Sequence, residues 1–272
     1  MLESSLINRA APPGSMRYFS ALYAPEEKRQ GLYALYVIDA EIRESAHSAN
    51  HDVAHTRLQW WRGEVDRLVN GNPLHPATRV LAGLGGSPAS YAKLHDFLAA
   101  ADMDLARMTY LNARELRAYC VRSGGVIQEL IAERLLAPEP LSEEARAFAN
   151  RIGVGVRQCE MLRDVRQDAY DGRLYLPLDQ LDRHGIGIEE LRAPEVAPAV
   201  KAALKEFQAM AREELAPPET PQPALRPLVV LGALYRRLLD RIAARDYEVA
   251  TERIELGPVE KPWVAWRAAL RS

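Results

Sequence analysis

An all-α fold is predicted by helix start and stop signals that recur along the chain, and by the lack of strand-like segments. Pro25 and the acidic residues after it suit a first helical turn, because proline fits that position and acids favour the positive end of the helix dipole. A second helix is expected over 56–69, where Asn-Gly-Asn-Pro ends it. Ser87 followed by proline predicts a third helix that runs to about residue 101. No alternating Val/Ile/Thr run joined by a hairpin turn is found.

The second half of the chain continues the helical pattern. Asn112 with Glu115 forms a capping-box pattern before an apolar stretch. A long helix is expected from Ser142 to about residue 170, followed by a short apolar loop at 174–178. The last helix predicted by the apolar spacing covers 228–245.

The connector at 216–227 is proline-rich but too short to be a domain linker. No internal repeat stands out, and 272 residues are ample to bury one core. We therefore expect a single domain over 1–272, with a flexible N-terminus at 1–15.

The composition is that of an ordinary globular protein, with 48% apolar and 26% charged residues. The net charge of -2, with both signs interspersed, gives no electrostatic footprint for nucleic acid. The two cysteines lie far apart and indicate neither a disulfide framework nor a zinc site, which suits a reducing cytosol. No secretory signal and no long uncharged apolar run is present. We expect a cytoplasmic protein that can contact a membrane peripherally to collect a lipid.

A pair of carboxylates carries the most chemical information. Asp164 and Asp168 are four residues apart, so on a helix both project from one face about one turn apart. Such a pair can hold Mg²⁺ through oxygen ligands, and the metal can bind substrate phosphates. By spacing alone, a solvated helix face with local ion pairs is the more common outcome.

The residues around this pair resemble a known family. Leu-Arg-Asp-Val-x-x-Asp at 162–168, followed by Gly-Arg-Leu-Tyr-Leu-Pro at 172–177, resembles the second aspartate-rich motif of the squalene and phytoene synthases. Segments at 29–36, 103–125 and 234–247 are similar to other helices of that family, in family order. The resemblance implies an isoprenoid-synthase-type helical bundle around a central apolar cavity. It also implies head-to-head joining of isoprenyl diphosphates such as farnesyl or geranylgeranyl diphosphate.

The resemblance assigns roles residue by residue. Asp164 and Asp168 match the metal-binding aspartates of the second motif, and Arg163 matches a neighbouring diphosphate-contacting arginine. Three tyrosines match residues that line the family's cavity, namely Tyr119, Tyr175 and Tyr235.

The first aspartate motif departs from the family pattern. Aligned without gaps, it falls on 43–47, where Arg43 replaces an aspartate and Glu44 is the one acid that remains. A cation at this place opposes a divalent metal by Coulomb repulsion. Glu41 and Glu44 can supply a substitute carboxylate pair, or Arg43 can itself bind phosphate so that fewer metals or none are needed.

The second motif helix departs from the pattern as well. Arg157 and Glu160 stand where glutamine and asparagine are usual, and Glu160 can ligate metal in place of the asparagine. Because half of the metal cage is missing, we favour binding over full catalysis. If the chain is active, we expect a Mg²⁺-dependent prenyltransferase.

The altered segment resembles a branch of the family that includes a mitochondrial assembly factor for respiratory complex I. The shared features are Ile-Asp-Ala-Glu-Ile-Arg-Glu at 38–44 and Arg57-Leu-Gln-Trp-Trp at 57–61. This resemblance implies the alternative function, a non-catalytic assembly or interaction factor with a protein partner.

Three other features have simpler interpretations. His47, His51 and His55 have helical metal-ligand spacing, yet their segment resembles a loop, so surface positions are expected for His51 and His55. The Trp60–Trp61 pair is expected to pack in the core. Asp102 and Asp104 can support metal or substrate, or Asp104 can cap a helix or pair with Arg107, and the sequence leaves these alternatives open.

Overall fold

The computed structural model describes residues 2–220 and 222–271, and within these ranges it is helical with no β-strand, which confirms the predicted class. The longer helices are α3 (Glu26–Ala46), α4 (His51–Val69), α6 (Leu94–Leu105), α8 (Val126–Leu136), α9 (Glu143–Tyr170), α12 (Pro198–Glu214), α13 (Arg226–Ala244) and α14 (Glu260–Ala269). The shorter ones are α1 (Ser4–Ala10), α2 (Met16–Leu22), α5 (Pro76–Gly83), α7 (Ala113–Cys120), α10 (Leu178–His184) and α11 (Ile188–Arg192). Short 3₁₀ helices lie at Pro88–Lys93 and Pro223–Leu225, and a π-helical turn at Val121–Gly125 joins α7 to α8.

Helix α9 begins and ends where the sequence predicts. The Ser142 hydroxyl accepts the backbone N–H of Ala145 and so satisfies one of the free donors of the first turn. The helix ends before Gly172, whose positive φ of 74° turns the chain back. Its 28 residues bury one face for almost the whole length, because small and apolar side chains recur at helical spacing.

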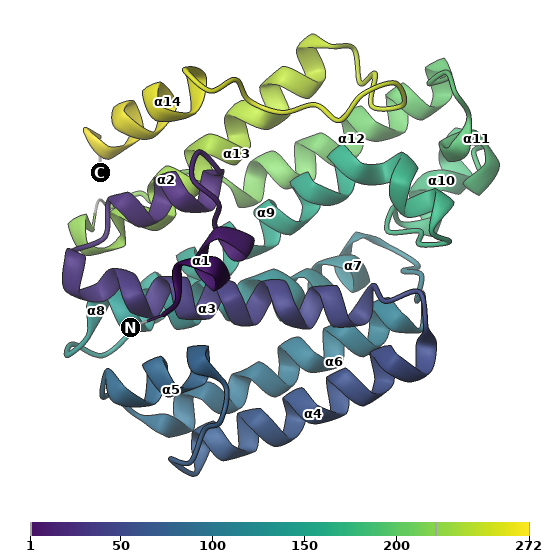
Figure 1. Cartoon of the computed structure of the whole chain (residues 1–272). Coiled ribbons are helices and arrows are strands. Elements are labelled where there is room, and N and C mark those ends of the chain that lie inside the picture. Colours follow the sequence, from purple (N-terminus) through teal and green to yellow (C-terminus); the bar gives the residue numbers. More distant parts are fainter. Residues whose placement is uncertain (1, 221, 272) are drawn as a thin grey trace.

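The bundle is arranged around α9. Helices α8, α12 and α13 pack along it, and α3 packs on α8. Figure 1 shows α9 crossing the middle of the molecule, with α4, α5 and α6 on one side and α12, α13 and α14 on the other. The right-hand ends of α3 and α9 in this view therefore lie in the same part of the bundle, and they carry the two acidic segments singled out in the sequence.

Two glycines let the π-helical turn approach α9 closely. A Cβ atom added to Gly124 would collide with the backbone carbonyl of Gly153, and one added to Gly153 would collide with the backbone of Gly124. Such close backbone approach requires residues without side chains. Arg157 lies one turn after Gly153 on α9. The contact between the two glycines therefore also sets the position of Arg157 relative to the π-helical turn.

The structure corrects some helix boundaries. The helix expected from 56 begins at His51, where Asn50 caps it. Ser87 makes no side-chain cap, and a 3₁₀ turn precedes α6. Asn112 accepts the N–H of Glu115 as expected, whereas the Glu115 carboxylate accepts from Leu111.

The ends of the chain hold helices that the sequence did not reveal. Helix α1 packs on α3, with Leu2 and Ala10 buried, so the described part of 1–15 is folded onto the bundle. The mobility of that segment and the single-domain organisation over 1–272 stay predictions. Helix α14 was not predicted at all. No helix in the described residues is long and apolar enough to span a bilayer.

Candidate functional site

Asp164 is held by two arginines. Its carboxylate accepts from Arg163 at 2.9 and 2.5 Å and from Arg253 at 2.9 and 3.2 Å. Burial opposes ionisation of this carboxyl group, but the two guanidinium groups outweigh it and hold its pKa below the usual value. Asp164 is therefore an anion whose oxygen atoms already have cationic partners.

Asp168 stands in contrast one turn further along α9. Its side chain forms no ion pair within the described residues. Burial raises its pKa to about 7. The positive charge of Arg157 lowers this pKa in part, and the negative charge of Asp164 raises it. The pair predicted from the i,i+4 spacing therefore lies on one helix, but its two members have different electrostatic environments.

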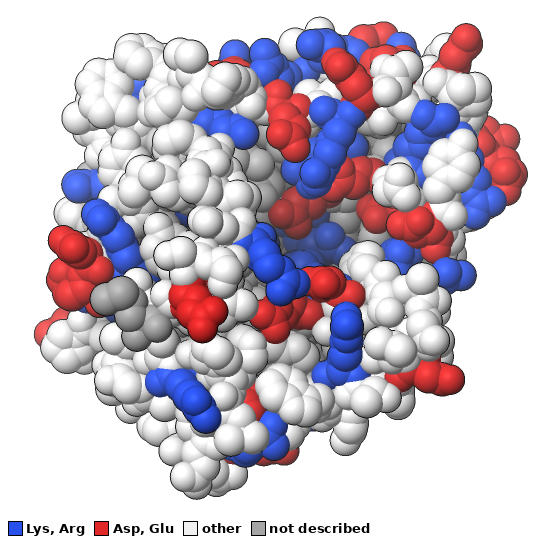
Figure 2. All heavy atoms as spheres, in the orientation of Figure 1, with Lys and Arg blue, Asp and Glu red and all other residues white. Residues whose placement is uncertain are grey.

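A small hollow of about 220 Å³ lies beside Asp164. Tyr235 of α13 and Glu160 of α9 line it, and the Tyr235 hydroxyl donates to Glu160 at 2.9 Å. Four cations and one further acid line it as well: Arg17, Arg163, Arg253, Lys261 and Glu255. Figure 2 shows a hollow near the centre of this face with Lys, Arg, Asp and Glu atoms around it. The lining of the 220 Å³ hollow carries four cations against two acids. Arg163 and Arg253 pair with Asp164 and Arg17 pairs with Asp39, so Lys261 is the cation of the lining that has no ion pair within the described residues.

A buried cluster of tyrosines surrounds Asp104, which is 4% exposed. Tyr119 and Tyr175 both donate their hydroxyl protons to Asp104 Oδ1, at 2.6 and 2.7 Å. Arg157 lies over both rings, 5.8 Å from the centroid of Tyr119 and 4.9 Å from that of Tyr175, and donates to the Tyr119 hydroxyl oxygen at 3.0 Å. The nearest oxygen of Glu160 is 3.9 Å from Arg157, which ties the cluster to the hollow.

A second buried ion-pair cluster connects α2 and α3 to the same region. Asp39 is 2% exposed and accepts from Arg17 and, at 2.9 Å, from Arg43. Burial opposes the charge on Asp39, but the two arginines outweigh it and lower its pKa. Arg43 also donates to the Ser123 carbonyl and lies over the Phe97 ring. Its Nη1 atom is buried without a hydrogen-bond partner in the described chain.

Glu41 and Glu44 do not join this site. Glu41 lies 3.3 Å from His75 and Glu44 lies 2.5 Å from Arg9. Both acids line a surface pocket of about 380 Å³ together with Arg9, Ser45, Arg57, Trp60, Trp61 and His75. A substitute carboxylate pair facing Asp164 and Asp168 is therefore not formed here, and Arg43 is the residue of this segment that reaches the site.

The donor set does not fit a magnesium cage. Asp164 is occupied by two guanidinium groups, and Glu160 accepts from Tyr235. Nowhere in 2–220 or 222–271 do three or more His, Cys, Asp or Glu side chains gather as metal ligands. A hard cation prefers several free oxygen atoms, whereas the atoms free here include the Nη1 of Arg43 and the Nε of Arg157. The magnesium role of Asp164, Asp168 and Glu160 stays a prediction.

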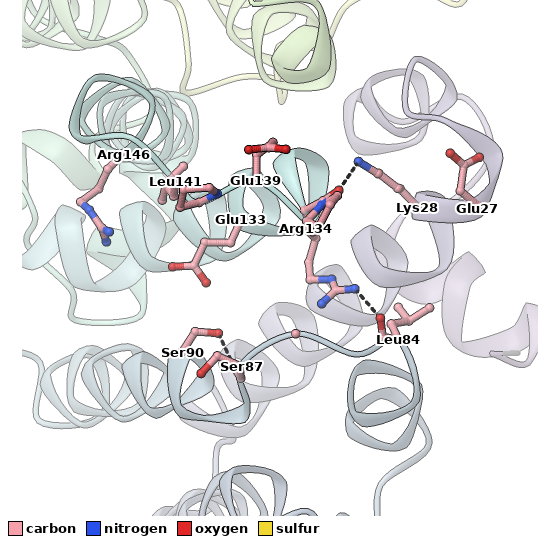
Figure 3. Close-up of a pocket in the computed structure, with 14 residues that line it drawn as sticks. Glu27, Lys28, Leu84, Ser87, Ser90, Glu133, Arg134, Glu139, Leu141 and Arg146 are labelled. Carbon is pink, nitrogen blue, oxygen red and sulfur yellow. Dashed lines mark hydrogen bonds between the residues drawn. The ribbon is translucent and has the colours of Figure 1, made fainter.

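A larger pocket of about 750 Å³ lies near the beginning of α3, whereas the candidate site lies near its end. Figure 3 shows its charged side chains reaching chain segments around the pocket rather than converging on a common point. Lys28 donates to the carbonyls of Leu135 and Ala137, and Arg134 donates to the carbonyl of Leu84. These groups join helix ends and loops, so we assign this pocket a structural role.

The remaining sequence candidates occupy other places. His51 and His55 are exposed on α4, as expected, and none of the three histidines belongs to a metal cluster within the described chain. Trp61 is buried, whereas Trp60 is 43% exposed, so the expectation of core packing is wrong for Trp60. Asp102 pairs with Arg62.

Sequence reasoning missed several residues of the site. Arg17, Arg253 and Lys261 come from distant segments without a motif. Asp39 lies in the segment 38–44, which the sequence linked to protein interaction and not to this site. Asp104 was a candidate with several roles left open, and its side chain accepts from two tyrosines and not from Arg107. Asp39 and Glu41 are the two charges in the otherwise apolar stretch 32–42, and this was the available signal for Asp39.

The fold and the charged site define a class, the all-helical isoprenoid synthase fold. A crystal structure of a dehydrosqualene synthase in complex with ligand superposes with a TM-score of 0.84 at 18% identity, covering 98% of this chain and 95% of that one. A squalene synthase from Alicyclobacillus acidocaldarius gives a TM-score of 0.70 at 18% identity, covering 89% and 92%. At these identities the likeness shows the fold.

The chain belongs to the squalene/phytoene synthase family, whose model matches residues 11–260. It is 28% identical over 255 residues to the chloroplastic phytoene synthase of Narcissus pseudonarcissus, covering 90% of this chain and 60% of that protein. It is 27% identical over 261 residues to the phytoene synthase of Thermus thermophilus, covering 93% and 85%. The chain therefore spans about 60% of the length of several plant relatives that it matches.

Proposed function

We propose that this protein binds isoprenyl diphosphates, such as farnesyl or geranylgeranyl diphosphate, and holds the diphosphate with arginine and lysine side chains. The observation that carries the proposal is the hollow beside Tyr235, where four cations converge from separate segments of the chain. A diphosphate would add to or replace the carboxylate partners of Arg17, Arg163 and Arg253, and Lys261 has no ion pair within the described residues. Guanidinium groups bind phosphate oxygens through paired, charge-assisted hydrogen bonds. The family of the chain and the phytoene synthase names of its relatives support this substrate class.

The buried groups support anion binding without a metal cage. The Nη1 atom of Arg43 and the Nε atom of Arg157 lack partners in the described chain. Neither residue lines the hollow itself, so both support anion binding there through their charge rather than through contact. Arg17 and Arg43 share the single carboxylate of Asp39, so this cluster keeps an excess of positive charge.

The family of the chain also suggests that the protein turns over the isoprenyl diphosphates that it binds. Head-to-head condensation releases a diphosphate, and the negative charge that develops on it must be stabilised. Arg163, Arg253 and Lys261 are the residues we assign to that role. The tyrosines around Asp104 would lie next to the prenyl chain, and the central apolar cavity that would hold it stays a prediction.

The first experiment measures binding and turnover of farnesyl and geranylgeranyl diphosphate with Mg²⁺ and with EDTA. We expect binding to persist in EDTA. The double variant Arg253→Gln/Lys261→Gln should weaken it at least about tenfold, because two charge-assisted contacts are removed. Arg114→Gln/Arg122→Gln is the matched control, since both arginines are exposed and lie outside the hollow.

Two results would contradict the arginine-held mode. One is the absence of any binding. The other is binding that requires Mg²⁺ and disappears in Asp164→Ala, because that variant should leave a metal-free mode in place. Release of pyrophosphate together with a coupled product would establish turnover.

A second function, a non-catalytic assembly or interaction factor of the complex I type, is favoured by a different observation. The two sequence features of that branch meet at one surface pocket, where Glu41 and Glu44 lie beside Arg57, Trp60 and Trp61. Trp60 is 43% exposed, which suits a partner-binding anchor. Under this function, Trp60→Ala with Arg57→Gln impairs assembly in cells and leaves isoprenyl diphosphate binding unchanged. A cellular defect that instead follows Arg253→Gln/Lys261→Gln would reject it.

A further inference from the structure

Helix α14 carries its large apolar residues on the solvent side, unlike a helix that only packs on a bundle. It turns small residues toward the bundle, where Ala265 is fully buried and Ala268 is half-buried. It turns large apolar residues outward. The exposed fractions are 80% for Val259, 56% for Trp263, 48% for Trp266 and 67% for Leu270. Their spacing of four, three and four residues places them on one stripe.

The two tryptophans form a continuous aromatic surface. Their ring centroids are 5.1 Å apart, and α14 packs on α13 and α2 through its other face. Figure 1 shows α14 at the outer edge of the bundle, and the corresponding region of Figure 2 is almost entirely uncharged. Packing within the chain does not account for two exposed tryptophans on one stripe, and a patch of this kind marks an interaction surface.

A groove of about 860 Å³ between α12, α13 and α14 adds positive charge to this surface. It is lined by five arginines and two acids, namely Arg212, Arg236, Arg237, Arg267, Arg271, Asp240 and Glu260. Both acids are already paired, Asp240 with Arg212 and Glu260 with Arg237 and Arg241.

Arg236, Arg267 and Arg271 form no ion pair within the described residues, so their charges are available to a partner. Burial, together with the nearby Arg212, lowers the pKa of Arg236, as expected for cations that crowd one another. An anionic partner would relieve that repulsion.

We propose that α14 docks the protein onto the surface of an anionic phospholipid bilayer. Tryptophan rings are suited to the membrane–water interface, because they have an apolar body and a polar N–H group. Arginines beside them would contact headgroup phosphates, as in other interfacial helices. The groove has an excess of three positive charges in a chain of net charge -2, which favours an anionic partner. The exposed apolar stripe beside the groove favours a bilayer as that partner.

The docking surface is separate from the diphosphate site and does not depend on the proposed ligand. The two are nevertheless adjacent, since Lys261 in the first turn of α14 lines the hollow beside Tyr235. A bilayer bound by α14 would therefore lie close to the mouth of that hollow.

The test is co-sedimentation of the full chain with phosphatidylcholine vesicles and with vesicles that also contain phosphatidylglycerol. We expect binding to the anionic vesicles that weakens as salt rises. Arg267→Gln/Arg271→Gln should lower the partition coefficient about 30-fold at low salt. Trp263→Ala/Trp266→Ala should lower it about tenfold or more. These side chains are exposed, so the variants are expected to fold, and circular dichroism checks this.

Matched controls remove similar side chains elsewhere. Trp60→Ala/Leu111→Ala removes two exposed apolar residues, and Arg114→Gln/Arg122→Gln removes two exposed arginines. Both should bind vesicles as the unmodified chain does. Failure of the unmodified chain to bind anionic vesicles, or equal binding by the tryptophan variant, would overturn the proposal. So would self-association by sedimentation velocity that Trp263→Ala/Trp266→Ala abolishes, because α14 would then join two copies of the chain.

Discussion

The acidic segments of α3 and α9 differ in how their carboxylates are used. Each acid in the second half of α3 forms an ion pair with a basic side chain. Asp39 pairs with two arginines, Glu41 with His75 and Glu44 with Arg9. On α9, Asp164 is paired, whereas Asp168 has no ion pair within the described chain. The buried acid of α3, Asp39, therefore stabilises the fold, and α9 keeps an acid that can respond to a ligand.

The largest expected effect concerns Asp39. Asp39→Asn should destabilise the protein by about 3 kcal/mol at pH 7, because Arg17 and Arg43 lose their shared carboxylate. The pKa of Asp39 is lowered in the folded state, so its contribution is present above the unfolded value of about 3.8 and is lost as pH falls through the folded value. Urea unfolding from pH 7 down to pH 2 measures this.

The matched control is Asp52→Asn on the exposed first turn of α4. It should change the free energy of unfolding by less than about 0.5 kcal/mol at every pH. Equal effects of the two substitutions at pH 7 would show that the α3 cluster does not stabilise the fold.

A smaller effect is expected for Asp168, and its sign separates the two binding modes. If arginines hold the diphosphate, Asp168→Asn removes a nearby negative charge and should tighten binding about threefold. If Mg²⁺ holds it through Asp168, the same substitution should weaken binding. Isothermal titration with farnesyl diphosphate at pH 8, where more of this carboxyl is ionised, gives the answer.

The smallest effect is expected at Glu44. Its side chain is 58% exposed and that of Arg9 is 57% exposed, so solvent screens their ion pair. Glu44→Gln should change the free energy of unfolding by less than about 0.5 kcal/mol. It should also leave diphosphate binding unchanged, because Glu44 lines the other pocket. Weaker diphosphate binding in Glu44→Gln would instead support the hypothesis that Glu41 and Glu44 form a substitute carboxylate pair.

The long central helices could be predicted because their caps and apolar spacing are local. Ser142 and the residues after it define α9 without reference to the rest of the chain. Helix α14 escaped prediction because it has no capping side chain and carries its large apolar residues on the solvent side. A pattern search assumes that large apolar residues face a core, and here that assumption fails.

The site could be predicted only where a motif carried it. Arg163 and Tyr235 line one hollow and Asp164 pairs with Arg163, so three residues that the resemblance singled out lie close together. The roles that the resemblance assigns to them stay predictions. Arg17, Arg253 and Lys261 could not be found, because two distant helices and the loop before α14 bring them together and no sequence spacing links them. The direction of Glu41 and Glu44 was equally hidden, since it depends on where Arg9 and His75 lie.

The contact between Gly124 and Gly153 sets a limit on how this protein can vary. In a library of random substitutions at all positions, these two should accept fewer replacements than any charged residue of the site. A methyl group at either one would push the π-helical turn away from α9. Arg157, whose Cβ lies 3.3 Å from the place of that methyl group on Gly124, would move with α9. The placement of a buried charge thus depends on two residues that contribute no side chain.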